Sequence, residues 1–265
     1  AIGAYGNDGN GNNSGHVRIY KNVNNNWIKI GSDIDGEGAG ENSGTSVSLS
    51  ADGSTVAIGA YGNDSNGNNS GHVRIYKNIN NIWTKIGSDI DGEAADDFSG
   101  RSVSLSSDGS IVAIGSKYND GNGNNSGHVR IYKNVNNIWM KIGSDIDGEY
   151  ADDQSGWSVS LSADGTTVAV GALLNDGDGG DSGHVRVYKI NLDTEIPSAP
   201  TSLTTTATTT SDTTPTITGT AEAGSTVTLY KGSISDNKTI TYNVSVEAKT
   251  SEHNSYGSGS GLGYK

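Results

Sequence analysis

The sequence contains no cysteine, three prolines, one methionine and one phenylalanine among its 265 residues. Without cysteine the chain can form no disulfide, no thiolate metal site and no cysteine nucleophile. Hydrophobic residues make up 32% of the chain, and no apolar run reaches the roughly 18 residues that a membrane-spanning helix requires. Apolar residues also never recur at helical spacing over a sustained segment, so the sequence favours short strands over a helical bundle.

Positive charge is also scarce, because 17 lysines and arginines accompany 30 acidic residues and leave a formal net charge of −13. An acidic chain repels phosphate backbones, so we expect no nucleic-acid partner. An acidic surface suits cation binding and solubility outside the cell, and we expect an extracellular or cell-surface location. The sequence shows no signal peptide and starts inside a repeat at Ala1, so we expect it to be a piece of a longer protein.

Glycine is abundant, with 39 residues, and much of it lies in a segment that recurs at a fixed spacing of 56 residues. A fixed period of this kind indicates a repeat architecture, in which similar structural elements stack on one another. The positions that keep the spacing are His16, His72, His128 and His184, then Trp27, Trp83 and Trp139, and then Asp52, Asp108 and Asp164.

Each repeat is predicted to contain four β-strands, which in the second copy are residues 46–50, 55–60, 72–77 and 83–87. The first strand alternates apolar and polar residues, and the second is a nearly continuous apolar run, which is typical of a strand buried on both faces. Asp52-Gly53 lies between them and is a strong hairpin signal, because glycine adopts positive φ at little cost.

Four strands joined by short turns predict an antiparallel sheet that cannot cover both of its faces alone. Copies arranged about an axis would cover them, so the fold class we predict is all-β, with the repeats as blades of a β-propeller that forms a partial ring. A β-solenoid is the alternative, although its coils are usually shorter and lack hairpins. The predicted domain of repeats is 1–190, divided into a partial blade at 1–37, full blades at 43–93 and 99–149, and a partial blade at 155–190.

The pattern stops at Ile190, and residues 191–200 are predicted to be a linker that holds two of the three prolines. Beyond it, residues 201–211 are rich in threonine and predicted to be extended. Alternating segments at 216–219, 225–230 and 239–246 are predicted strands, the first two on either side of a short turn. The last residues, 251–265, are rich in glycine and serine and are predicted to be a flexible tail.

Motifs in the repeats resemble those of a known family: GRSVSL at 100–105, DG at 108–109, VAIGA at 56–60 and GHVRIY at 71–76. Over residues 1–190 the chain is similar to the FG-GAP repeat of integrin-type β-propellers, in its bacterial form. The family's acidic calcium loop between the first two strands has no counterpart in the short connection at 51–54, so that calcium role does not carry over there. Serine replaces Phe of the Phe-Gly pair in Ser43-Gly44, Ser99-Gly100 and Ser155-Gly156, and the Pro of Gly-Ala-Pro is replaced by Tyr5, Tyr61, Lys117 and Leu173.

The sequence SDTTPTITGTAEAGSTVTLYKG at 211–232 resembles the opening of a bacterial Ig-like module. We therefore assign 201–250 to a partial Ig-like β module. The resemblance implies a stalk, because such modules serve as stalks in large surface adhesins.

The loop between the second and third strands is the predicted metal site. In the last copy Asp176, Asp178 and Asp181 offer three carboxylates with glycines between them, and hard oxygen ligands of this kind suit Ca²⁺. The equivalent loops hold one carboxylate each, at Asp8, Asp64 and Asp120, and are weaker candidates. The alternative is that Asn, Asp and Gly only form the turn.

Three further features have a structural alternative that we favour. The acidic run at 89–93, with copies at 33–37 and 145–149, places carboxylates on one side of an extended chain, where they either recruit a cation or keep a sheet edge soluble. The repeated histidines lie too far apart to share one ion, and we expect them to be structural. The repeated tryptophans either stack on a sugar ring or, as the default, pack between blades.

No catalytic or cofactor-binding motif is present, so we expect no enzyme activity. The predicted function is a non-catalytic binding or adhesion scaffold with a protein or glycan ligand at the cell surface, with Ca²⁺ as the candidate cofactor. The alternatives are a carbohydrate-binding or polysaccharide-acting propeller and a purely structural spacer. The sequence leaves the ligand, the number of blades and the oligomeric state open.

Overall fold

The computed structural model describes residues 1–192, 201–205, 217–220, 225–234 and 240–248. Every regular element in these residues is a β-strand, and all pairs between strands are antiparallel, so the all-β prediction is confirmed. No helix among them has the length and apolar character needed to cross a membrane. The chain divides into two compact units, Ala1–Leu192 and Asp193–Lys265.

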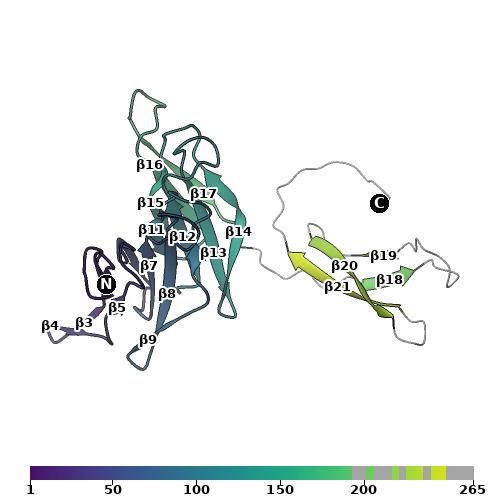
Figure 1. The fold of residues 1–265 in the computed structure, drawn as a ribbon, viewed down its shortest axis with the longest axis horizontal. Helices are drawn as coiled ribbons and strands as arrows, with labels where there is room; N and C mark the ends of the chain where they lie inside the picture. Colours follow the sequence, from purple (N-terminus) through teal and green to yellow (C-terminus); the bar gives the residue numbers. More distant parts are fainter. Residues whose placement is uncertain (193–200, 206–216, 221–224, 235–239, 249–265) are drawn as a thin grey trace. The chain divides into compact units, whose positions relative to one another are not determined.

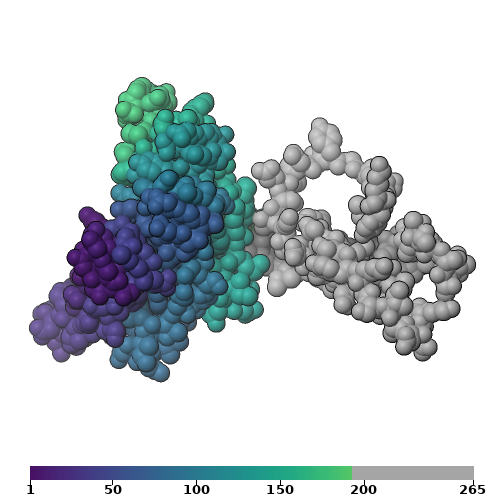
Figure 2. Space-filling model, in the orientation of Figure 1, coloured from purple at the N-terminus to yellow at the C-terminus, as the bar shows by residue number. Residues whose placement is uncertain are grey.

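The first unit contains four repeats, which we number by chain order as repeat 1 (1–37), repeat 2 (43–93), repeat 3 (99–149) and repeat 4 (155–190) (Figure 1). Repeat 1 forms a three-stranded and a two-stranded sheet, and each of the other three repeats forms one sheet. Figure 2 shows the repeats as successive bands of colour from purple to green. Repeat 1 contains β1 (Ile2–Ala4), β2 (His16–Arg18), β3 (Tyr20–Val23), β4 (Asn26–Lys29) and β5 (Ile34–Asp35), and repeat 2 contains β6 (Ser46–Leu49), β7 (Thr55–Ala60), β8 (His72–Ile79), β9 (Ile82–Lys85) and β10 (Ile90–Asp91). Repeat 3 contains β11 (Ser99–Leu105), β12 (Ile111–Ser116), β13 (His128–Val135) and β14 (Ile138–Asp147), and repeat 4 contains β15 (Ser155–Leu161), β16 (Thr167–Ala172) and β17 (His184–Lys189).

In repeats 3 and 4, strands that are consecutive in sequence are neighbours in the sheet, as in the order β11-β12-β13-β14, whereas β5 pairs with β2 in repeat 1 and β10 pairs with β8 in repeat 2. The Asp-Gly hairpin forms as expected: the Asp52 carboxylate accepts hydrogen bonds from the Ser50 hydroxyl and the Ser54 N–H, and Gly53 adopts φ of +69°. At the next hairpin, Asn80 and Asn81 both have positive φ, which asparagine tolerates better than other side chains.

The fourth strand is longer than predicted. In repeat 3 it is one strand, β14, which pairs with β13 along its length across an irregularity in register. In repeat 2 the same irregularity divides it into β9 and β10, which pair with the two halves of β8. The acidic run is therefore the second half of the fourth strand, because the chain returns to the same partner strand after a short bulge.

The hydrophobic core lies between repeats. Three clusters of buried side chains join repeat 1 to repeat 2, repeat 2 to repeat 3 and repeat 3 to repeat 4. In the second cluster of this series, Val73 and Ile75 pack with Val112 and Ile114. Each sheet buries its apolar face against the sheet of an adjacent repeat. This confirms the prediction that one repeat cannot cover its own faces and depends on its neighbours to do so.

The two ends of the series leave apolar surface uncovered. Val185 and Val187 of β17 are 68% and 66% exposed, whereas the equivalent Val129 and Ile131 of β13 are buried. Trp27 of repeat 1 is 71% exposed, whereas Trp139 packs against the core. Each internal repeat thus depends on its neighbours for burial that the terminal repeats lack.

The sheets approach closely at glycines. A Cβ atom on Gly59 of β7 would lie well under 3.0 Å from the carbonyl oxygen of Gly100 in the next repeat. The Ser46 hydroxyl donates a hydrogen bond of 2.8 Å to that same carbonyl, and Ser102 and Gly156 repeat the contact one interface later. Only glycine allows the two backbones this separation.

In the second unit, β18 (Thr201–Thr205) pairs with β19 (Ile217–Thr220), and β20 (Ser225–Ile234) pairs with β21 (Ile240–Ala248). The strands predicted at 216–219 and 225–230 both form, but each pairs with a different partner instead of the other. Residues 193–200 of the predicted linker at 191–200, and the predicted tail at 251–265, lie outside the described residues.

Candidate binding sites between the repeats

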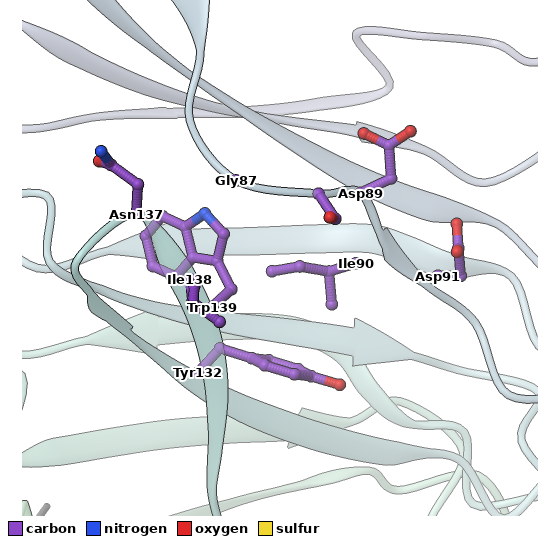
Figure 3. Close-up of a pocket in the computed structure, with 9 residues that line it drawn as sticks. Gly87, Asp89, Ile90, Asp91, Tyr132, Asn137, Ile138 and Trp139 are labelled. Carbon is purple, nitrogen blue, oxygen red and sulfur yellow. The ribbon is translucent and has the colours of Figure 1, made fainter.

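A pocket of about 430 Å³ lies between repeats 2 and 3. Figure 3 shows Trp139 and Asn137 at one end of it, Asp89 and Asp91 at the other, and Tyr132 and Ile90 between them. Repeat 2 supplies residues 87–91, from the bulge and β10, and repeat 3 supplies the tyrosine and the hairpin at 137–139. The pocket therefore exists only because two repeats are adjacent.

The indole of Trp139 is fixed within this pocket. Its Nε1 donates a hydrogen bond of 2.9 Å to the carbonyl of Ile86 in the preceding repeat, and Trp83 makes the same bond to Ile30 one interface earlier. Packing between blades was the favoured interpretation of these tryptophans, and the hydrogen bond explains why tryptophan serves better than a purely apolar ring.

The same contacts recur between repeats 1 and 2. A Cβ atom on Gly31 would meet the carbonyl of Asn81 and the indole of Trp83, as one on Gly87 would meet Asn137 and Trp139. The sequence thus places an aromatic ring beside an acidic strand at both interfaces. In repeat 1, Trp27 has no preceding repeat to contact within the described residues and is exposed.

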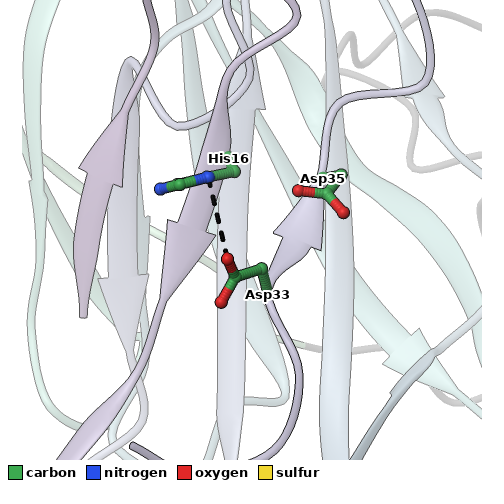
Figure 4. A group of neighbouring side chains, drawn as sticks. All are labelled: His16, Asp33 and Asp35. Atoms are coloured by element: carbon green, nitrogen blue, oxygen red, sulfur yellow. Dashed lines mark ion pairs between the residues drawn. The ribbon is translucent and has the colours of Figure 1, made fainter. Parts of the chain in front are cut away.

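A second cluster lies where the third and fourth strands pair, and it joins the repeated histidine to the acidic run. Figure 4 shows it in repeat 1, where His16 Nδ1 lies 3.9 Å from a carboxylate oxygen of Asp33, beside Asp35. In the two later copies the histidine gathers one carboxylate from its own repeat and one from the preceding repeat. These groups are Glu37, His72 and Asp89, and Glu93, His128 and Asp145, each with ligand atoms within 4.8 Å of one another.

These histidines are buried at the start of β8 and β13. His72 is 0% exposed and His128 is 1% exposed. Burial lowers the pKa of His128 to about 4, with a further contribution from the neighbouring Arg130 cation. Burial, followed by Arg74, also lowers the pKa of His72, so both imidazoles are neutral at pH 7.

Basic side chains balance the carboxylates of this cluster. Arg74 lies 3.1 Å from Glu37, and Lys85 lies 2.8 Å from Asp89. In repeat 1 the hydrogen bonds from Arg18 and Lys29 hold the pKa of Asp33 well below its usual range. In repeat 3 burial raises the pKa of Asp147, with Asp145 nearby.

The predicted calcium loop is held by hydrogen bonds within its own turn. The Asp176 carboxylate accepts the backbone N–H of Asp181, and the backbone N–H of Asp178 donates to Ser182. Asp8, Asp64 and Asp120 make the same loop contact, each with the asparagine five residues later. The three carboxylates at 176–181 are not among the groups that converge within 4.8 Å in the described chain, and calcium binding there stays a prediction.

The carboxylates in and just after the acidic run contact different partners. Asp89 faces the histidine of its own repeat, whereas Glu93 faces His128 of the next. Asp97, close behind in the sequence, accepts a hydrogen bond from the buried Asn119 and so anchors the loop of the next repeat. Sequence reasoning considered the histidines and the carboxylates separately. Their shared period of 56 residues was the signal that could have joined them.

Two segments of the chain, residues 33–76 and 146–188, match the FG-GAP repeat family. Each match begins in the acidic run of one repeat and ends in the third strand of the next, so the resemblance predicted from the sequence is confirmed for these segments. No curated protein matches the chain by sequence. Among solved structures, the periplasmic gluconolactonase PpgL of Pseudomonas aeruginosa aligns with 86% of this chain and 78% of its own, at 10% identity and a TM-score of 0.34.

Proposed function

We propose that this chain is a non-catalytic binding scaffold, located at the cell surface or outside the cell, in which the interfaces between FG-GAP repeats present equivalent pockets to one ligand. The observation that carries the proposal is the pocket between repeats 2 and 3, whose wall and rim residues recur at the preceding interface. Copies of one pocket at a fixed spacing suit a ligand that is itself repetitive, because several weak contacts then act together.

A glycan is the ligand class that this pocket fits best. Trp139 and Tyr132 offer aromatic surface for the C–H face of a sugar ring, and Asp91 and Asn137 offer polar atoms for its hydroxyl groups. Trp139 is already held by its hydrogen bond to Ile86, so a ligand need not order it. In this proposal the repeats belong to a β-propeller, and residues 201–250 belong to an Ig-like stalk.

Near-identical repeats support a non-catalytic role. An enzyme needs one pocket with specialised acid and base groups, whereas here the same residues recur at successive interfaces. Calcium at Asp176, Asp178 and Asp181 remains part of the proposal as a stabiliser of the loop in repeat 4. Thermal unfolding with added Ca²⁺ and with chelator tests it, and an unchanged midpoint would remove calcium from the proposal.

A glycan array with the full chain tests the main proposal. The informative variant is Asp91→Asn, because this exposed side chain lines the pocket and its removal leaves the Trp139 contact intact. We expect it to weaken binding by about tenfold, the equivalent of one hydrogen bond to a charged group. Trp27→Leu is the matched control, since that indole lies outside the pocket and should leave binding unchanged.

The array also separates the alternatives. Binding that is unchanged when Asp91→Asn is combined with Asp35→Asn, its equivalent at the preceding interface, would place the ligand elsewhere on the scaffold and contradict the pocket. No binding to any glycan, combined with no capture of a protein ligand, would favour the structural spacer.

A further inference from the structure

His72 carries a fully buried imidazole. It is 0% exposed, and neither of its ring nitrogens has a hydrogen-bond partner in the part of the chain that the structure describes. A buried polar atom left unsatisfied destabilises the folded state, so natural proteins rarely keep one without a compensating contact. A bound water molecule or an ion would provide the ring nitrogens of His72 with the contact they lack.

The surroundings of His72 favour an ion. Glu37 from repeat 1 and Asp89 from repeat 2 each bring a carboxylate oxygen within 4.8 Å of the imidazole nitrogen and of each other. With metal–ligand bonds of about 2.1 Å, ligands on opposite sides of one ion lie at most about 4.2 Å apart. Three ligands spaced evenly around one ion lie about 3.6 Å apart, so carboxylate rotations that shorten the longest separation by about 1 Å bring all three ligands onto one ion.

The same arrangement recurs at the next interface. His128 is 1% exposed, its Nε2 has no hydrogen-bond partner among the described residues, and it gathers Glu93 from repeat 2 and Asp145 from repeat 3. Both interfaces therefore place a buried histidine with an unsatisfied nitrogen beside two carboxylates, one from each adjoining repeat. This recurrence indicates that the arrangement belongs to the repeat and not to the local geometry of one loop. In repeat 1, His16 has both carboxylates from its own repeat, Asp33 and Asp35.

We propose that the interfaces between repeats 1 and 2 and between repeats 2 and 3 each bind a divalent first-row transition metal ion of the Zn²⁺ class. Each site has three ligands: the histidine and one carboxylate of the later repeat, and one carboxylate of the earlier repeat. Imidazole nitrogen suits Zn²⁺, Ni²⁺ or Fe²⁺, whereas Ca²⁺ and Mg²⁺ prefer oxygen ligands alone. The ion ties adjacent sheets together, because its ligands come from both. This site is distinct from the loop at 176–181 and from the glycan pocket, although Asp89 touches both the site and the pocket.

The neighbouring cations set the expected strength of binding. Arg74 and Lys85 contact Glu37 and Asp89 through one oxygen of each carboxylate, Oε1 and Oδ1. With neutral His72 these four charges cancel, so the ion enters a site without net negative charge. We therefore expect affinity well below that of a structural zinc site with thiolate ligands, which are charged and free of competing cations.

The test is a titration of the chelator-treated full chain with Zn²⁺ alone. Binding is monitored by isothermal calorimetry and by the thermal unfolding midpoint, and the visible absorption of bound Co²⁺ is a separate readout. The variant is His72→Gln combined with His128→Gln, which keeps each site neutral and close in volume. We expect it to bind two fewer ions per chain and to lose most of the rise in unfolding midpoint that Zn²⁺ gives the parent.

His184→Gln is the matched control. His184 begins β17 as His72 begins β8, but Glu149 is its one ion-pair partner among the described residues, and that carboxylate also contacts Arg186. The position equivalent to Asp89 is Thr201, which has no carboxylate. This variant should bind as many ions as the parent. If the double histidine variant fails to fold, Glu37→Gln with Glu93→Gln tests the same two sites.

Two outcomes would overturn the proposal. One is a parent chain that binds no Zn²⁺ at millimolar concentration, which would assign the unsatisfied nitrogens to buried water. The other is a double histidine variant with unchanged stoichiometry, which would place the ions elsewhere. Loss of zinc binding with glycan binding retained would support this site and leave the glycan pocket unaffected, so the two proposals fail independently.

Discussion

Replacing Gly59 by alanine should separate repeat 2 from repeat 3 and destabilise the protein. The added Cβ would lie well under 3.0 Å from the carbonyl oxygen of Gly100, a backbone atom that cannot rotate away. Inserting a methyl group into a packed interface typically costs about 1–3 kcal/mol. The hydrogen bond from Ser46 to the same carbonyl would also break, at a cost of about 1 kcal/mol. We expect a total near 2–4 kcal/mol.

The chain offers a matched control for this substitution. Gly115 repeats the contact at the next interface, where its Cβ would meet the carbonyl of Gly156. Gly171 holds the same position in repeat 4, but its Cβ would meet closely only the hydroxyl of Ser158, a side-chain end that can turn aside. None of the three glycines is among the residues with positive φ, so alanine fits each backbone.

The assay is thermal and denaturant unfolding of the three single variants. A loss of 2–4 kcal/mol lowers the unfolding midpoint of a domain of this size by roughly 4–16 °C. We expect that shift for Gly59→Ala and Gly115→Ala and little change for Gly171→Ala. Equal effects in all three would refute the interface as the cause, because the local strand environment is all that they share.

Two further predictions concern single side chains. Trp139→Phe keeps the apolar contact but loses the hydrogen bond to Ile86, so it should cost about 1 kcal/mol in a denaturant melt, whereas Trp27→Phe, at an exposed indole, should cost almost nothing. The hydrogen bond from the Ser50 hydroxyl, followed by the Ser54 N–H, lowers the pKa of Asp52 from 3.8 to about 2. Because the folded-state value is the lower one, this contribution to stability is present above about pH 4 and lost as the pH falls towards 2, and an NMR titration of Asp52 with a midpoint near 4 would contradict it.

The repeat and most of its strands follow from local sequence. The apolar run at 55–60 and the Asp-Gly pair before it, at 52–53, are enough to locate β7 and its hairpin with β6, because both signals act between residues close in sequence. The second half of the fourth strand was missed, since Ile90-Asp91 is too short to show alternation by itself. The pairing of β19 and β20 with other partners was missed for a related reason: a turn signal does not reveal which strand lies on the far side.

The candidate sites were harder to predict, because each one is built from two repeats. Glu37 and His72 come from different repeats, and so do Asp91 and Trp139. Periodicity along one strand describes which residues share a face of one sheet, and it carries no information on which face of the neighbouring sheet lies opposite. Residue type alone made the histidines look structural, and only the geometry placed carboxylates from two repeats around each buried ring.

If the sites belong to interfaces, then removing one repeat should remove one interface and leave the rest intact. Deleting residues 99–154 joins Phe98 to Ser155, a junction equivalent to the natural one between Gln154 and Ser155. Repeat 2 would then face repeat 4, whose core strands repeat those of repeat 3. We expect a folded chain with a smaller dependence of unfolding free energy on denaturant, because less surface is exposed on unfolding.

The deletion removes Trp139 and His128 but keeps Trp83, His72, Glu37 and Asp89. One glycan pocket and one inter-repeat metal site should therefore remain, with binding stoichiometry reduced by one for each. A chain that fails to fold would show that repeat 3 makes contacts its copies cannot replace. The tilted ring contacts of Phe98 with Tyr61 and Tyr118 are candidates for such a contact, because the repeats differ in sequence at these positions.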